Sequence, residues 1–138
     1  MSEPFSADNV APVAEFRAGL RRFLRITERN ARAAGLTPQR YLLLLMIKGA
    51  ADHSEQSTVT ELAERLQLAQ STVTELVRRA EEIGLVERER SPVDGRIAHL
   101  RLAPEGERRL AQAFSSNAGE RQTLLDAFDT LRSRVIAG

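Results

Sequence analysis

The chain has 138 residues, of which 42% are apolar and 28% are charged, and this composition is typical of one soluble globular domain. Its formal net charge of +1 argues neither for nor against a nucleic-acid partner. The absence of cysteine excludes disulfides, thiolate metal sites and thiol-based redox sensing.

The first residues carry acids and no apolar run, so no signal peptide is expected. The longest apolar run, Tyr41 to Ile47, is far too short to span a bilayer. We therefore expect a cytoplasmic protein that has no membrane partner.

A first helix is predicted from Pro12, because proline is favoured in the first turn of a helix, to Gly35. Residues 1–11 before it are predicted to be a loose tail. One side of the helix is lined by Phe16, Leu20, Phe23, Leu24, Thr27 and Ala31, which recur at helical spacing.

A second helix is predicted to begin at Thr37 and Pro38, with the threonine as N-cap and the proline at the first helical position. Residues 41–47 are apolar on every side of this helix, which predicts the centre of the hydrophobic core. The stretch 52–57 is predicted to be a loop because of its polar composition.

Two short amphipathic helices follow, separated only by a short turn. The first opens at Thr58, which has capping-box spacing to Glu61. Such a pair is typical of a helix-turn-helix, although the turn lacks the usual glycine. Ala69 stands where an N-cap Ser or Thr is expected, so Ser71 or Thr72 is predicted to cap the second of these helices instead. Its apolar stripe consists of Val73, Leu76, Val77, Ala80 and Ile83.

The other face of that helix carries hydrogen-bonding side chains in its first turns, where a recognition helix meets base edges in the major groove. Arg78 is placed to bind guanine or a phosphate, and Arg79 to bind a backbone phosphate. Glu75 can either accept from a cytosine amino group or pair with these arginines, and the ion pair is the favoured interpretation. The candidate base contacts are Gln70, Ser71, Thr72 and Thr74.

Two short alternating runs around a turn at 91–96 predict a β-hairpin. Alternation with period two puts Arg88 and Arg90 on one face, so a segment of zero net charge can offer a cationic surface. Asp94 is spaced to hold the guanidinium of Arg96, an arrangement that suits a narrow minor groove. The alternative for this last pair is a surface ion pair of little energetic value.

A helix opening at 103–106, a break within 115–119 and a last helix complete the chain. We expect the first and last helices to pack against a second copy, since two-fold dimers are the commonest oligomers. One domain is therefore predicted, with dimerisation helices at 12–35 and 103–138 around a DNA-binding region at 36–102. The last helix has apolar residues at Leu124, Leu125, Phe128, Leu131 and Val135.

The sequence resembles the MarR family of winged helix-turn-helix regulators. The resemblance is carried by the stretches 36–47 and 58–90, the Asp-Gly-Arg of 94–96, and 100–110. It implies a mainly α fold of about six helices with a small β-hairpin wing. It also implies a homodimer that binds double-stranded DNA at an inverted-repeat operator, usually as a repressor. Relief by a small ligand, often an aromatic acid, lodged between the dimerisation and DNA-binding parts is implied as well.

Two departures from the family limit what carries over. A basic residue often stands in the family where this chain has Glu75, so base preference is not transferred. The branch that senses peroxide through cysteine is excluded. Effector-binding residues stay unassigned: Arg40, Tyr41 and His53 lie near the region, but packing or plain exposure explains each of them.

Other classes of function have less support. His53 and His99 fall in a predicted loop and strand without metal-ligand spacing, and the chain has no nucleophile motif or phosphate loop. We therefore expect no enzyme activity, cofactor or metal. The remaining alternative is a winged helix that binds protein without specific DNA binding, although such a wing has no need of arginines gathered on one side.

Overall fold

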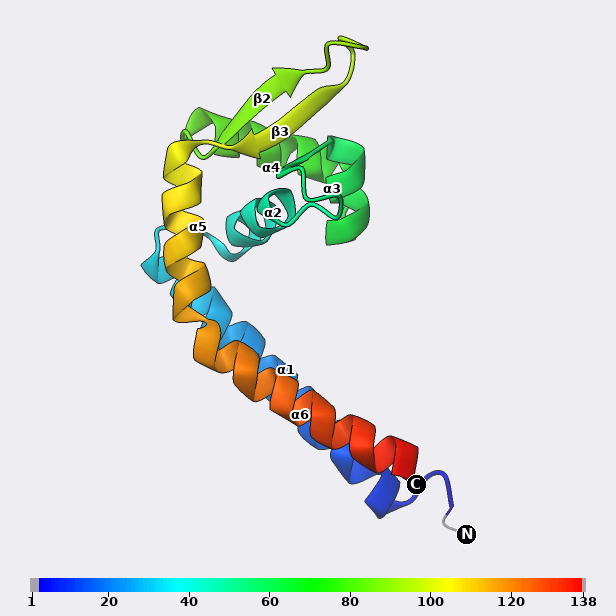
Figure 1. Ribbon diagram of the computed structural model, residues 1–138. Coiled ribbons are helices and arrows are strands. Elements are labelled where there is room, and N and C mark those ends of the chain that lie inside the picture. Colours follow the sequence, from blue (N-terminus) through cyan, green and yellow to red (C-terminus); the bar gives the residue numbers. More distant parts are fainter. Residues whose placement is uncertain (1–2, 138) are drawn as a thin grey trace. The chain divides into compact units, whose positions relative to one another are not determined.

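The computed structural model describes residues 3–137, with side chains through Arg134. This part of the chain contains six helices and three short strands (Figure 1). It forms two compact units, one of residues 31–113 and one of the terminal segments 1–30 and 114–138. The predicted mainly α fold with a small β-hairpin wing is confirmed.

Helix α2 (Pro38–Lys48) supplies much of the core of the unit of residues 31–113. Thr37 caps it as predicted, because its hydroxyl accepts the backbone N–H of Arg40 at 3.2 Å. Leu43, Leu44 and Ile47 are completely buried, but Leu42 is 42% exposed. The prediction of burial on every side is therefore wrong, because neighbouring elements cover only part of the helix circumference.

Helices α3 (Val59–Leu66) and α4 (Gln70–Glu82) form the helix-turn-helix. The predicted capping box of Thr58 and Glu61 is present, with both reciprocal hydrogen bonds. Gln67 replaces the usual turn glycine by adopting a left-handed conformation with φ of 58°.

Two details of α4 differ from prediction. Ala69 is its N-cap and makes no side-chain cap, because the helix begins at Gln70 and so places Ser71 and Thr72 inside its first turn. The predicted capping by these hydroxyls is wrong. Ile83 also leaves the apolar stripe and is 46% exposed, because the helix has already ended at Glu82.

The sheet has three antiparallel strands in the order β1-β3-β2. Strands β2 (Val86–Arg90) and β3 (Ala98–Leu102) form the predicted hairpin. Strand β1 (Gln56–Ser57) pairs with the other edge of β3, so the prediction of an uninterrupted loop at 52–57 is wrong. The pairing gives the backbone of β3 hydrogen-bond partners on both edges. Strand β1 has only two residues, too few to show an alternation of apolar and polar side chains, so it could not be predicted from the sequence.

Helix α5 (Pro104–Ser116) follows β3 directly and begins against the base of the hairpin. The backbone N–H of Ala103 donates to the carbonyl oxygen of Leu85 at 2.9 Å. Gly106, in the first turn of α5, lies over the same carbonyl with no room for a side chain. This close approach joins α5 to the strand that leads into the wing.

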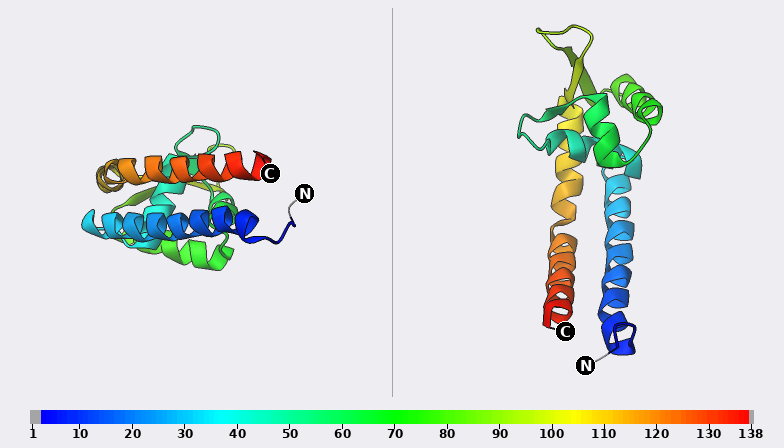
Figure 2. Two further views of the ribbon diagram at one scale, coloured as in Figure 1. Left: turned by 90° about the horizontal axis from the view of Figure 1, so that it is seen from below. Right: turned by 90° about the vertical axis from the view of Figure 1, so that its right-hand side faces the viewer.

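In the other unit, residues 7–30 of helix α1 (Ala7–Ala33) lie antiparallel to helix α6 (Ala118–Ala137) (Figure 2). The rings of Phe16 and Phe128 meet edge to face with centroids 6.0 Å apart. At the break before α6, the amide of Asn30 donates to Oδ1 of Asn117 at 2.7 Å. The predicted break within 115–119 is confirmed.

The start of α1 corrects the prediction of a tail through residue 11. The hydroxyl of Ser6 accepts the backbone N–H of Asn9 at 3.3 Å, and the helix begins at Ala7. Pro12 therefore lies inside the helix, close to its N-terminal end, and its missing N–H removes one backbone hydrogen bond there. The predicted contribution of the Val135 side chain lies outside the described side chains. None of the helices within residues 3–137 is long and apolar enough to cross a membrane.

Candidate nucleic-acid interface

The first turns of α4 present a row of uncommitted hydrogen-bonding groups. Gln70, Ser71, Thr72 and Thr74 are all exposed, as their positions off the apolar stripe predicted. Within residues 3–137 none of these four side chains has a hydrogen-bond partner, in contrast to the charged side chains that follow. They are therefore available for base edges without breaking any interaction first.

The charged part of α4 is tied into one network. Arg78 donates from Nε and Nη2 to the two carboxylate oxygens of Glu75, at 2.9 and 2.6 Å. Arg79 donates from Nε to the same carboxylate at 3.0 Å, and Arg78 also pairs with Glu82. These hydrogen bonds hold the pKa of Glu75 down at about 2. The favoured interpretation of Glu75 as an ion-pair partner is confirmed.

The wing tip places one arginine far into solvent. Arg96 donates from Nε and Nη2 to the two oxygens of Asp94, at 3.1 and 3.2 Å, and its backbone N–H donates to the same carboxylate at 3.0 Å. The hydrogen bonds from Arg96 lower the pKa of Asp94. The side chain of Arg96 is nevertheless 91% exposed, so the guanidinium is oriented without being covered.

The strand register confirms the predicted sorting of charge, because Arg88 and Arg90 lie on one face of β2. Both arginines, however, also have partners within the protein. Arg88 lies opposite the buried Leu100 and pairs with Glu81 of α4 at 2.9 Å, which raises the pKa of Arg88. Arg90 donates to the carbonyl oxygen of Gly95 at 2.6 Å. Both side chains therefore brace the wing in this structure, and their contact with DNA stays a prediction.

A groove beside α4 was not foreseen from the sequence. It has a volume of about 710 Å³, and it brings the start of α2 next to the exposed face of α4. The N-cap at Thr37 predicts where α2 starts. That this start lies beside α4 depends on non-local packing, which the sequence pattern does not indicate. The groove is lined by Thr37, Pro38, Gln39, Arg40, Ser71, Thr72, Glu75, Leu76 and Arg79.

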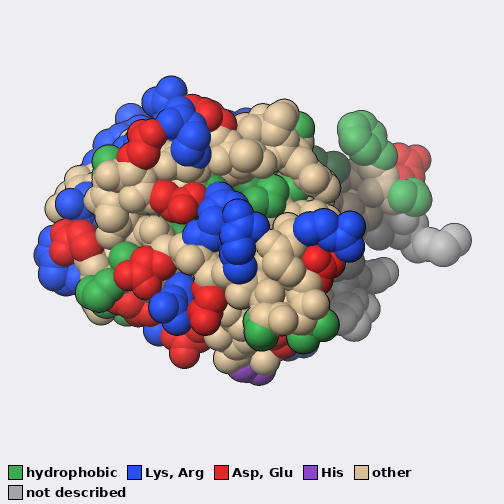
Figure 3. All heavy atoms as spheres, turned by 90° about the horizontal axis from the view of Figure 1, so that it is seen from above, with side chains coloured by type: hydrophobic (Ala, Val, Ile, Leu, Met, Phe, Trp, Pro, Cys, Tyr) green, Lys and Arg blue, Asp and Glu red, His purple; other side chains and the backbone are tan. Residues whose placement is uncertain are grey.

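The surface of this region carries charges of both signs. In the view from above the wing and α4, Lys and Arg side chains stand beside Asp and Glu side chains rather than forming one large basic area (Figure 3). The described residues contain no group of three or more His, Asp or Glu side chains placed to hold a metal ion. The exposed face of α4 and the wing tip therefore differ from the rest of this surface in their local geometry, not in an excess of positive charge.

Comparison with known proteins decides the family. A model of the MarR family matches residues 34–97. The uncharacterized HTH-type transcriptional regulator YsmB of Bacillus subtilis (strain 168) is 30% identical over 129 residues, which cover 91% of this chain and 84% of that protein. The chain belongs to the MarR family of winged helix-turn-helix transcriptional regulators.

Solved MarR-family structures share the fold. AbsC of Streptomyces coelicolor superposes with a TM-score of 0.70 at 16% identity, over 89% of this chain and 82% of that one. A mutant of MarR from E. coli, solved in complex with operator DNA, gives a TM-score of 0.69 at 21% identity, over 99% and 98% of the two chains. The family assignment accounts for α3, α4 and the wing as one winged helix-turn-helix.

Proposed function

We propose that this MarR-family chain is a homodimeric repressor that binds an inverted-repeat operator in double-stranded DNA and is released by a small ligand. The observation that carries the DNA part is the exposed, unpartnered polar face of α4 beside a wing whose Arg96 is oriented by Asp94. The complex of a MarR mutant with operator DNA supports the same use of the fold here.

Each part of this interface matches a different feature of DNA. Gln70 pairs naturally with adenine, and Ser71, Thr72 and Thr74 suit several base edges or the thymine methyl group. The wing arginine, which lies in the turn between β2 and β3 rather than on α4, suits the negative potential of a narrow minor groove. The proposal therefore assigns base contacts to α4 and groove-width recognition to the wing.

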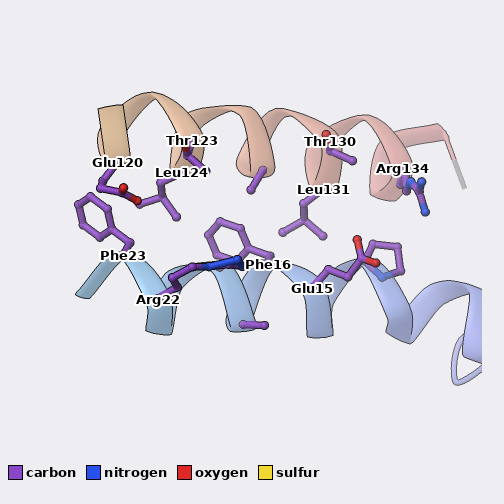
Figure 4. A pocket seen from close by; sticks show the side chains of 14 residues that line it. Glu15, Phe16, Arg22, Phe23, Glu120, Thr123, Leu124, Thr130, Leu131 and Arg134 are labelled. Atoms are coloured by element: carbon purple, nitrogen blue, oxygen red, sulfur yellow. The ribbon is translucent and has the colours of Figure 1, made fainter. Parts of the chain in front are cut away.

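The dimer part of the proposal is supported by where apolar surface remains. Of the eleven exposed large apolar side chains in the described part of the chain, seven lie in the unit of the terminal segments, among them Leu24, Phe114, Leu125 and Phe128. A groove of about 360 Å³ also runs between α1 and α6, with Phe16, Phe23, Leu124 and Leu131 turned toward it (Figure 4). Exposed apolar surface of this kind marks an interaction site, and the proposed occupant is a second copy of the chain.

The decisive experiment is selection of bound duplexes from random DNA, followed by binding measurements with the upstream region of the protein's own gene. The proposal expects an enriched inverted repeat and a linear, steep fall of log affinity with log salt, because phosphate contacts release counterions. Repeating the selection with a panel of aromatic acids tests the ligand step. A protein that enriches no sequence and shifts no duplex at any salt contradicts the proposal.

Replacing Arg96 by alanine should weaken operator binding by more than about 1 kcal/mol, the usual scale for a charged hydrogen bond, or at least about fivefold. Affinity is measured by titrating a labelled operator duplex. Arg108→Ala is the matched control, because Arg108 has the same forked pairing with a carboxylate, that of Glu105, but lies on α5 rather than on the wing. Equal loss in both variants would show that only general charge matters.

The alternative, a winged helix that binds protein, has one observation in its favour. Val93 at the wing tip is 95% exposed, and Ile97 nearby is also exposed. The duplex selection distinguishes the two functions, because a protein-binding wing enriches no DNA sequence.

A further inference from the structure

We infer that Glu75 is a specificity-determining residue, which occupies Arg78 and Arg79 so that α4 gains little from non-cognate DNA. The inference rests on the proposed function and deepens it. Its basis is the ion-pair network of Glu75, Arg78, Arg79 and Glu82 on the exposed face of α4.

The network occupies the donors that would otherwise bind phosphate. Arg78 uses Nε and Nη2 on the two oxygens of Glu75, and Nη1 on Glu82. Its forked edge, which is the part that grips a phosphate or guanine bidentately, is therefore filled by Glu75. Arg79 uses its Nε on the same carboxylate at 3.0 Å.

The charges of this network also cancel. The two arginines and the two glutamates Glu75 and Glu82 sum to zero, and without Glu75 the same surface would carry one positive charge. The pKa of Glu75 is held at about 2, so it stays ionised at any pH used for DNA binding. The carboxylate is thus a permanent negative charge on a helix that approaches phosphates, and it repels them.

The ion pairs are exposed, so they can be exchanged for better partners. Side chains of Glu75, Arg78 and Arg79 are about half exposed, and exposed pairs of this kind contribute little to stability. On a non-cognate duplex, an arginine that exchanges Glu75 for a phosphate leaves the Glu75 carboxylate unpaired and close to the negative charge of the DNA backbone. On a G·C pair, guanine can accept the fork of Arg78 while the cytosine amino group donates to Glu75. Only the cognate contact satisfies both signs of charge.

The test compares Glu75→Gln with Glu105→Gln. The control is closely matched, because Glu105 pairs with Arg108 and Arg109 at 2.6 and 2.8 Å in the same Glu-x-x-Arg-Arg arrangement on α5. Glutamine keeps the shape of the side chain and removes only its charge. Affinities are measured for the selected operator and for a scrambled duplex of equal length, across a salt series, after thermal unfolding confirms that both variants are folded.

We expect Glu75→Gln to bind the scrambled duplex more tightly, with a salt slope steeper by about one to two, as one or two arginines become free for phosphates. The ratio of operator to scrambled affinity should fall by about tenfold, the scale of one lost base contact. Glu105→Gln should change neither quantity. A purely structural role for Glu75 would leave the salt slope unchanged.

Three outcomes separate the claims. An unchanged ratio and slope in Glu75→Gln overturns the inference while the proposed function stands. Equal changes in Glu105→Gln also overturn it, because general charge would then be the cause. A wild-type protein that does not distinguish operator from scrambled duplex overturns the proposed function, and the inference fails with it.

Discussion

The double variant Leu125→Glu/Phe128→Glu should be a monomer at micromolar concentration, where the wild-type protein should be a dimer. Both side chains lie on α6 and are about half exposed in the single chain, at 57% and 48%. In the proposed dimer they contact the second copy, so each glutamate would place a carboxylate in an apolar interface.

An unpaired carboxylate in such a surface costs several kcal/mol, and two per copy should weaken the dimer by at least about 100-fold. Light scattering and sedimentation at a series of concentrations measure the change. Operator binding should weaken as well, because a dimer gains most of its affinity for an inverted repeat by binding both half-sites at once.

Val93→Glu is the control for added surface charge. This residue is the most exposed large apolar side chain of the wing tip, and it lies in the other compact unit. The control should leave the oligomeric state unchanged. If the double variant keeps the wild-type dissociation constant, or if the wild-type protein is itself a monomer at micromolar concentration, the proposed interface is wrong.

The features that sequence reasoning placed well are local ones. Thr37 and Thr58 were recognised as caps, because a cap needs only a side chain and a backbone N–H three residues on. The pairs of Glu75 with Arg78 and of Asp94 with Arg96 are also set by spacing along one element or one turn. Their geometry follows from the backbone without knowledge of the tertiary fold.

Local reasoning failed where two weak signals competed. Proline at position 12 predicts the start of the first helix there, but the cap at Ser6 places the start at Ala7. A proline can also stand inside a helix near its start, as Pro12 does at the cost of one hydrogen bond, so it marks the neighbourhood of a start rather than the start itself. Ala69 shows the converse, since α4 begins without any side-chain cap because tertiary packing of its apolar stripe fixes it.

Non-local features could not be predicted from spacing. Arg88 pairs with Glu81 because the hairpin lies against α4, a relation that depends on the fold of 81–100 as a whole. The groove between the start of α2 and the exposed face of α4 has the same origin. For the wing this matters, because an arginine assigned to DNA by alternation alone turns out to have a protein partner as well.

Gly106→Ala should be the most destabilising single methyl addition among the described glycines. A Cβ at this position would lie 2.1 Å from the carbonyl oxygen of Leu85, far inside van der Waals contact. The obstruction is backbone, and that oxygen already accepts the N–H of Ala103, so relief requires α5 to move away from the base of the hairpin. No side chain can rotate out of the way.

Overpacking of this kind costs about 1–3 kcal/mol, and we expect the upper end because backbone must shift. The loss would exceed the gain of up to about 1 kcal/mol that alanine has over glycine inside a helix. Gly119→Ala is the matched control, because Gly119 is in the first turn of α6 and a Cβ there meets nothing within 4 Å. The control should be neutral or slightly stabilising.

Thermal and denaturant unfolding at one fixed protomer concentration measure both variants, because dimerisation makes the midpoint depend on concentration. The Gly106 variant should also lose operator affinity, since the same contact sets α5 against the strand that leads into the wing. If it is as stable as the wild-type protein, the first turn of α5 does not hold the base of the hairpin. The wing would then be oriented chiefly by the pair of Arg88 with Glu81.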